Sequence, residues 1–216
     1  VLQPNTLLMD VGSTKCDVVA AAQQHLGERL SCFVPAHPIA GKELAGIEHA
    51  ESNLYQARRT ILTPLPQTGE AQLQAARAVW EAVGSHVTVM NPEAHDATFA
   101  AVSHLPHLLA FAAVNALTAQ AQGDTFLQMA GPGFRDFSRI AASDPAVWRD
   151  ILSANQAEVL TQMAHFRTAL DAFETVLTQG DTAALQHLIQ QASQVRSDWT
   201  LQAGNACHTA SETQRS

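Results

Sequence analysis

The architecture of this 216-residue chain is read best from the stretch Cys32-Phe33-Val34, which is followed by His37-Pro38-Ile39-Ala40-Gly41-Lys42-Glu43. An apolar run here precedes a histidine and a glutamate that flank a Pro/Gly turn. A second apolar run, Leu7 to Val11, ends in Gly12-Ser13-Thr14-Lys15. Because α/β proteins bind ligands beyond the carboxyl ends of their strands, we expect the two polar strand ends to face one pocket.

Short β-prone runs alternate with amphipathic stretches up to about residue 90. The β-prone runs are Leu7 to Val11, Ser31 to Val34, Thr60 to Leu62 and His86 to Met90. The stretch from Gln72 to Val83 places its apolar residues on one face of a helix. This alternation is typical of an α/β fold.

The strand pattern ends after Asn91-Pro92, and apolar residues then recur every three or four positions. Two such segments run from Val159 to Val176 and from Leu185 to Trp199. Gly180-Asp181 between them predicts a helix stop followed by an N-cap. The second part of the chain is therefore predicted to be all helix.

Pro106 lies inside a long helical pattern that runs from Glu93 to Gln120. Proline removes one backbone hydrogen bond, so the helix is expected to kink between His104 and His107. The kink could help to line a ligand site, or it could only accommodate the packing of the domains, and the sequence leaves both alternatives open.

The composition excludes several classes of protein. Hydrophobic residues make up 46% of the chain, which is enough for a substantial core, while the net charge of -8 argues against a nucleic-acid partner. No apolar run approaches the roughly twenty residues of a membrane span, and the N-terminus has no signal-peptide pattern. Cys16, Cys32 and Cys207 are isolated and predict free thiols. We therefore expect a globular, cytoplasmic protein without a membrane partner.

Four segments occur in an order and at a rough spacing that resemble one known family. They are Asp10 to Lys15, His37 to Glu43, Ser103-His104-Leu105-Pro106-His107, and Gly131 to Arg139 running on to Ser143-Asp144-Pro145 and Trp148-Arg149-Asp150. On these segments, which span residues 6 to about 180, the chain resembles the prephenate/arogenate dehydrogenase family, which makes tyrosine precursors. The resemblance implies the C-terminal part of a Rossmann-like NAD(P)-binding domain over residues 1–90 and a helical substrate-binding and dimerisation domain over 91–203. Residues 204–216 are expected to be a disordered tail, because they are rich in Ser and Thr.

The chain departs from the family in one respect. Members begin with a strand, a Gly-rich turn and a helix that bind the dinucleotide pyrophosphate, and no Gly-x-Gly-x-x-Gly occurs here. We therefore expect a fragment that lacks about one βαβαβ half. If these residues were the whole protein, NAD or NADP binding and dehydrogenase activity would be severely impaired. The choice between the two cofactors, and that between prephenate and arogenate, stay open.

The family reaction is an oxidative decarboxylation, and it implies roles for residues of the first two segments. His37 corresponds to the neutral base that accepts the hydrogen bond of the ring hydroxyl. A structural histidine that caps the Pro38 turn is the alternative. Ser13 resembles the serine between this histidine and the nicotinamide, with a helix N-cap as its alternative. Gly12 is expected beside Ser13 at the cofactor.

The later segments imply the substrate contacts. Arg139 is expected to bind the ring carboxylate, because a guanidinium forms paired charge-assisted bonds. Asp136 is expected to help fix it through an ion network that includes Arg135, although Arg135 also fits a surface salt bridge. Trp148 lines the site or packs in the core. Glu43 and His107 are placed by the resemblance at the mouth of the pocket.

Two further readings come from other classes of protein. His95-Asp96, followed by His104 and His107, superficially supplies the ligands of a metal-dependent hydrolase, although each also fits a structural polar residue and no metal site is predicted. A noncatalytic helical dimerisation or regulatory module is the other reading. Family members form homodimers through intertwined helical domains, so Arg139 or Trp148 is expected to be available to the partner's site.

Overall fold

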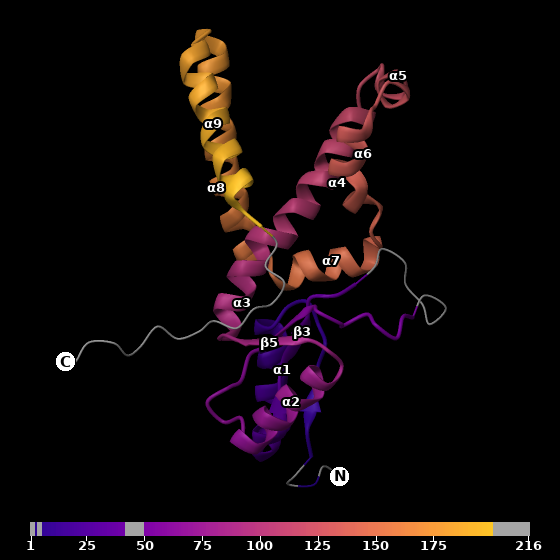
Figure 1. The fold of residues 1–216 in the computed structure, drawn as a ribbon, viewed down its shortest axis with the longest axis vertical. Helices are drawn as coiled ribbons and strands as arrows, with labels where there is room; N and C mark the ends of the chain where they lie inside the picture. Colours follow the sequence, from indigo (N-terminus) through magenta and orange to yellow (C-terminus); the bar gives the residue numbers. More distant parts are fainter. Residues whose placement is uncertain (1–2, 4–5, 42–49, 201–216) are drawn as a thin grey trace, which may run out of the picture.

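The computed structural model describes residues 3, 6–41 and 50–200, and an α/β part is followed by a helical part (Figure 1). Strands β1 (Leu8–Met9) and β2 (Phe33–Val34) pair in parallel. Strands β3 (Ala36–Pro38), β4 (Arg59–Leu62) and β5 (His86–Val89) form a mixed sheet in that order. β3 is antiparallel to β4, and β4 is parallel to β5. The predicted class, α/β and then all helix, is confirmed.

Two hydrophobic clusters hold the α/β part together. Helix α1 (Cys16–Leu26) and the 3₁₀ helix η1 (Gly27–Cys32) pack beside β2 in a cluster made of Val19, Ala22, Leu30, Phe33 and Leu65. Helix α2 (Glu70–Ala82) covers the sheet through a cluster made of Val34, Ala36, Leu62, Ala76 and Trp80. Because both clusters include residues of β2 or β3, they fix the strand ends that carry the polar residues of the sequence motifs.

The segment around His37 differs from the expected turn. Residues 36–38 form the edge strand β3, in which His37 lies opposite Ile61 of β4. The N–H of Ile39 donates to Arg59 at 2.7 Å, and that of Thr63 donates to Pro35 at 2.9 Å. Pro38 is tolerated in this strand because an edge strand leaves one side of its backbone unpaired. His37 is therefore held by a sheet, and it does not cap a turn.

The long helical pattern that begins at residue 92 forms three consecutive pieces. They are α3 (Pro92–Phe99), the π-helical turn η3 (Ala100–His104) and α4 (Leu105–Thr118). The irregular turn lies N-terminal to Pro106 and not between His104 and His107 as expected. Proline has no N–H and its ring crowds the carbonyl one turn earlier, so the turn before it widens.

The remaining helices build the upper part of the molecule (Figure 1). They are α5 (Gly123–Gln128), α6 (Pro132–Ser138), the 3₁₀ turn η4 (Arg139–Ala142), α7 (Pro145–Ala154), α8 (Gln156–Gln179) and α9 (Thr182–Asp198). α8 and α9 form one arm, and α4 to α6 form another. Gly180 ends α8 in a left-handed conformation, and Asp181 caps α9 by accepting the N–H of Ala184 at 2.9 Å, as predicted.

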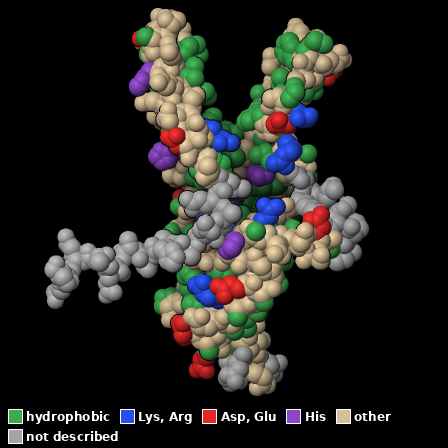
Figure 2. Space-filling view, in the orientation of Figure 1, with side chains coloured by type: hydrophobic (Ala, Val, Ile, Leu, Met, Phe, Trp, Pro, Cys, Tyr) green, Lys and Arg blue, Asp and Glu red, His purple; other side chains and the backbone are tan. Residues whose placement is uncertain are grey.

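Large apolar side chains stay exposed on the helical part. Among the described residues they include Phe126, Met129, Phe137, Leu160, Leu170, Leu177, Ile189 and Val195. Figure 2 shows hydrophobic atoms on the upper parts of both arms. A single chain therefore leaves an apolar surface unpartnered, which is typical of a protein that associates.

One helix of the described chain, Pro92–Thr118, is long and apolar enough to cross a membrane by length and composition. This helix differs from the expectation that no apolar run approaches the length of a membrane span, because polar residues interrupt its apolar ones. Three of them, His95, Asp96 and His104, are at most 3% exposed. Only 28% of the apolar window is buried within the chain, and its buried polar residues contact other parts of the protein, as His95 does with His37 and Asp96 with Asn155.

Candidate active site

A cavity of about 660 Å³ lies where the α/β part meets the helical part. Its walls come from the loop after β1, from β3 and the residues that follow it, and from η3, α4, η4 and α7. They include Val11, Ser13, His37, Pro38, Ile39, Ala40, Gly41, Tyr55, Phe99, Val102, Ser103, His107, Arg139, Ile140, Ser143 and Trp148. Five of the residues expected at a site, Ser13, His37, His107, Arg139 and Trp148, thus line one cavity. Their chemical roles stay predictions.

Two other expected residues, Asp136 and Gly12, are not among those that line the cavity. Glu43 falls outside the described residues. Asp136 is exposed and pairs with Arg135 at 2.9 Å, which matches the surface salt bridge that was the alternative for this pair. Gly12 adjoins the cavity residues Val11 and Ser13, and its N–H donates to the carboxylate of Asp10 at 2.9 Å.

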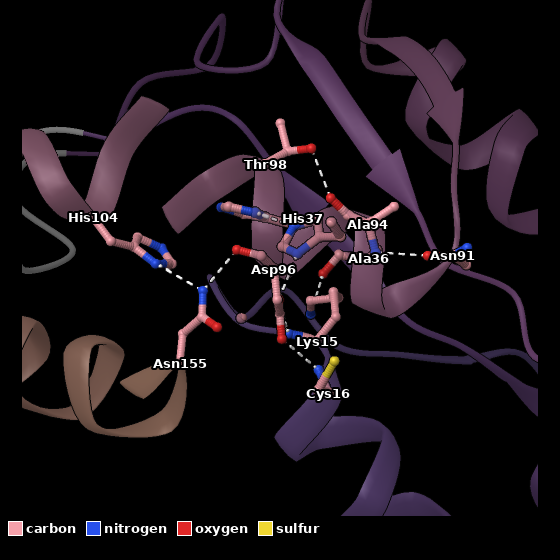
Figure 3. A network of polar contacts seen from close by, with 12 residues as sticks. Lys15, Cys16, Ala36, His37, Asn91, Ala94, Asp96, Thr98, His104 and Asn155 are labelled. Carbon is pink, nitrogen blue, oxygen red and sulfur yellow. Dashed lines mark hydrogen bonds and ion pairs between the residues drawn. The ribbon is translucent and has the colours of Figure 1, made fainter. Parts of the chain in front are cut away.

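His37 is the first member of a buried chain of hydrogen bonds (Figure 3). Its Nδ1 lies 2.8 Å from Nε2 of His95, and Nδ1 of His95 lies 2.7 Å from Oδ1 of Asp96. Burial, and then the neighbouring His95 and Lys15, lower the pKa of His37 to about 3. His37 is therefore neutral at physiological pH, as a hydrogen-bond acceptor for a hydroxyl group must be.

Asp96 connects this row of hydrogen bonds to the start of α1 (Figure 3). Its carboxylate accepts the backbone N–H groups of Lys15 and Cys16, each at 2.9 Å. Burial alone would raise the pKa of Asp96, but the hydrogen bonds from His95 and from these N–H groups lower it to about 2. A carboxylate from α3 therefore caps α1, and the alternative of Ser13 as the N-cap is wrong.

Lys15 is fully buried beneath the cavity. Its ammonium donates to the carbonyl of Ala36 at 2.8 Å and pairs with Asp10, which also accepts the N–H of Ala36 at 2.9 Å. Burial lowers the pKa of Lys15, and Asp10 opposes that change. The pair ties the end of β1 to the start of β3, and so holds Ser13 and His37 at one site.

Asn155 joins the helical part to the same network, and nothing in the sequence pointed to it. Its side-chain amide donates to the carbonyl of Asp96 at 2.8 Å and lies 3.1 Å from Nδ1 of His104. Burial lowers the pKa of His104 to about 4, so this histidine is also neutral. His95 and His104 thus have the satisfied structural environment that was their alternative, and His95 also contacts His37.

His107 and Trp148 form the opposite wall of the cavity. Their rings stack with centroids 3.5 Å apart and planes 19° apart. Nδ1 of His107 lies 2.9 Å from the carbonyl oxygen of Ser103, which accepts its hydrogen.

Three other cavity residues, Tyr55, Phe99 and Ser103, had no role predicted from the sequence, although Ser103 lies in one of the four family segments. Phe99 lies against both His37 and His95, with ring centroids 4.9 and 4.5 Å away. In the sequence, Phe99 follows His95 by about one helical turn, and this spacing by itself indicates only a position in the core. No group of three or more His, Cys, Asp or Glu side chains within the described ranges is arranged to hold a metal ion. The hydrolase reading therefore has no ligand set in this part of the chain.

Two family sequence models match the chain. "Prephenate dehydrogenase, nucleotide-binding domain" matches residues 1–89, and "Prephenate dehydrogenase, dimerization domain" matches residues 91–191. The prephenate dehydrogenase of Bacillus subtilis is 33% identical over 197 residues, which cover 90% of this chain and 53% of that protein. The chain therefore spans about half the length of this curated relative.

Solved structures are similar as well. The prephenate dehydrogenase of Aquifex aeolicus in complex with hydroxyphenyl propionate and NAD+ is 37% identical, with a TM-score of 0.84 over 92% of this chain and 68% of that one. The arogenate dehydrogenase of Synechocystis is 30% identical, with a TM-score of 0.79 over 92% of this chain and 71% of that one. The similarity thus extends over both the α/β part and the helical part.

Proposed function

The chain belongs to the prephenate dehydrogenase family, and from this premise we propose that it catalyses the NAD(P)-dependent oxidative decarboxylation of prephenate, of arogenate or of both. The observation that carries the proposal is the meeting of a neutral histidine, a serine and an arginine in one cavity between the two parts of the chain. We propose residues 1–90 as the nucleotide-binding part and residues 91–203 as the helical domain.

His37 is the proposed base. Its Nδ1 is occupied by His95, so Nε2 is the atom available to the ring hydroxyl of the substrate. As hydride leaves the carbon that bears this hydroxyl, Nε2 takes the hydroxyl proton. When carbon dioxide departs and the ring becomes aromatic, the electron pair of the broken bond reaches that oxygen, and His37 returns the proton to form the phenol. His37 is therefore neutral again, with a free Nε2 lone pair, at the end of the reaction.

Arg139 and the aromatic wall are proposed to hold the substrate. A guanidinium binds a carboxylate through two parallel bonds and keeps its charge when water is excluded. Arg139 approaches the cavity from η4, on the side of the helical domain, while His37 approaches from β3. A substrate between them is oriented with its carboxylate and its hydroxyl toward different walls. Phe99 and Trp148 exclude water from the same space.

The residues after β1 fit a nicotinamide ring. Val11 is 62% exposed at the carboxyl end of the parallel β1–β2 pair and lines the cavity beside Ser13. Gly12 allows a tight turn there, because a Cβ would come within 3.1 Å of Asp10 Oδ2. The bound NAD or NADP supplies the hydride acceptor. Val11 would pack against its ring, and the Ser13 hydroxyl would hydrogen-bond between that ring and His37.

We further propose that the protein is a homodimer formed through its helical domain. The exposed apolar residues of α5, α6, α8 and α9 support this, because a monomer would leave them in water. Association would bring the partner's helices near the cavity walls formed by Arg139 and Trp148. We also propose a cytoplasmic location, because the free thiol of Cys16 is typical of a reducing compartment.

The test is reduction of NAD and NADP, followed by absorbance, when the protein that carries these residues is offered prephenate and then arogenate. Light scattering on the same sample measures its mass. Reduction with either substrate supports the proposal, and the preferred pair identifies substrate and cofactor. A dimer without any reduction would instead support the noncatalytic dimerisation module.

A further inference from the structure

We propose that His95 and Asp96 are positioning residues that hold His37 in the Nδ1–H tautomer and so keep its Nε2 lone pair directed at the substrate hydroxyl. The inference rests on the proposed function, because it concerns the same base. It assigns a task to two buried residues that do not line the cavity.

The direction of the hydrogen bonds follows from Asp96. An ionised carboxylate accepts hydrogen bonds and donates none, and the pKa of Asp96 is lowered to about 2. The hydrogen between His95 and Asp96 is therefore on Nδ1 of His95. A neutral His95 then has a lone pair on Nε2, which lies 2.8 Å from Nδ1 of His37. His37 must donate that bond, and its own Nε2 becomes the acceptor.

The surroundings keep this arrangement in place. His95 is fully buried and Asp96 is 3% exposed, so no water competes for their hydrogen bonds. Phe99 packs against both imidazoles and restricts their rotation. The geometry is informative because a neutral histidine side chain in water favours the opposite tautomer, with the hydrogen on Nε2. In that tautomer His37 would present a donor to the substrate and could not take a proton.

Asp96 also positions the other side of the site. The same carboxylate that orients His95 accepts the N–H groups of Lys15 and Cys16, which follow Ser13 in the turn before α1. One side chain from α3 therefore aligns the His37 strand and the Ser13 turn together. Among the residues that the structure describes, the titratable groups that influence the pKa of His37 are His95 and Asp96 from α3, His104 from η3 and Lys15 from the turn before α1.

The direct test needs no activity. Long-range ¹H–¹⁵N correlation of the ¹⁵N-histidine-labelled protein at neutral pH reports which nitrogen of each ring carries the hydrogen. The signals of His37 and His95 are identified by their loss in His37→Asn and His95→Gln. We expect Nδ1–H and an unprotonated Nε2 for both residues. A hydrogen on Nε2 of His37, with a doubly protonated His95, would overturn the proposal.

Variants connect the tautomer to turnover. His95→Leu removes the acceptor, so we expect His37 to shift toward the Nε2–H form and kcat to fall at least tenfold with KM nearly unchanged. His95→Gln offers an oxygen at this place and should recover part of kcat. Asp96→Asn presents an amide donor to His95 and should reverse both tautomers. We therefore expect kcat to fall in Asp96→Asn as well, as it does when the carboxylate that orients a general base is replaced by an amide.

His104→Gln is the matched control, because His104 is an equally buried histidine that contacts Asn155 instead of His37. It should leave the tautomer of His37 unchanged. An unchanged kcat in His95→Leu would overturn the positioning role. The expected tautomers in a protein that reduces neither NAD nor NADP would contradict the proposed function instead, and the two failures are therefore distinguishable.

Discussion

The imidazole of His107 lies flat against the indole of Trp148, with their ring centroids 3.5 Å apart. This contact joins α4 to α7 and forms one wall of the cavity. We expect Trp148→Ala to raise KM about two- to tenfold, because an aromatic pair contributes about 0.5–1.5 kcal/mol beyond the area that it buries. Trp148→Phe retains a ring and should stay close to the original KM. Steady-state kinetics measure the KM of both variants. A KM of Trp148→Ala equal to that of the original protein would contradict a role for the stack.

Replacing the proposed base should act on turnover alone. We expect His37→Asn to lower kcat by about 10²- to 10⁴-fold, which is the usual contribution of a general base. The dissociation constant of NAD or NADP should stay similar, because the side chain faces the substrate hydroxyl. Single-turnover kinetics and a fluorescence titration of the cofactor measure the two effects. A variant with normal turnover would dismiss His37 as the base.

Arg139 should act mainly on substrate binding. Loss of a charge-assisted hydrogen bond costs about 1.5–3 kcal/mol, so Arg139→Gln is expected to raise KM about ten- to hundredfold. Arg139→Lys keeps the charge and loses the paired geometry, so its KM should lie between that of the original protein and that of Arg139→Gln. Arg135→Gln is the control, because that side chain is 75% exposed and pairs with Asp136. A similar rise in KM for both glutamine variants would argue against a specific role of Arg139.

The stability of the fold should fall as the pH is lowered below 6.5. The pKa values of His37 and His104 are lowered by burial to about 3 and about 4, so between these values and 6.5 the unfolded chain binds more protons than the folded one. Each such histidine then removes up to about 1.4 kcal/mol from the free energy of unfolding per pH unit. Urea denaturation at pH 4.5, 5.5, 6.5 and 7.5 measures the slope.

His104→Gln supplies the comparison for the pH series. It removes one of the two histidines whose pKa is lowered and keeps a polar side chain near Asn155. The slope between pH 4.5 and 6.5 should become shallower in this variant, whatever its stability at pH 7.5. An identical slope would show that His104 does not contribute to the acid sensitivity.

Several features were predictable because they depend on local sequence. The alternation of β-prone runs and helix faces predicted the α/β part, and the stop at Gly180-Asp181 predicted the α8–α9 hairpin. The order of the motifs indicated the family resemblance, and the resemblance predicted Ser13, His37 and Arg139 as site residues. Helical periodicity, capping and motif order are all readable within one turn or one short segment.

Other features depend on groups that are far apart in the chain. Asp96 accepts hydrogen bonds from the backbone of Lys15 and Cys16, some 80 residues earlier, and Asn155 reaches back to Asp96. The strand at His37 exists because β4 lies beside it. The sequence thus established the elements and the family of this protein. Packing of α3 against α1 and β3 established which polar groups meet, because the ionisation and tautomer of a buried side chain depend on its neighbours in space and not on those in sequence.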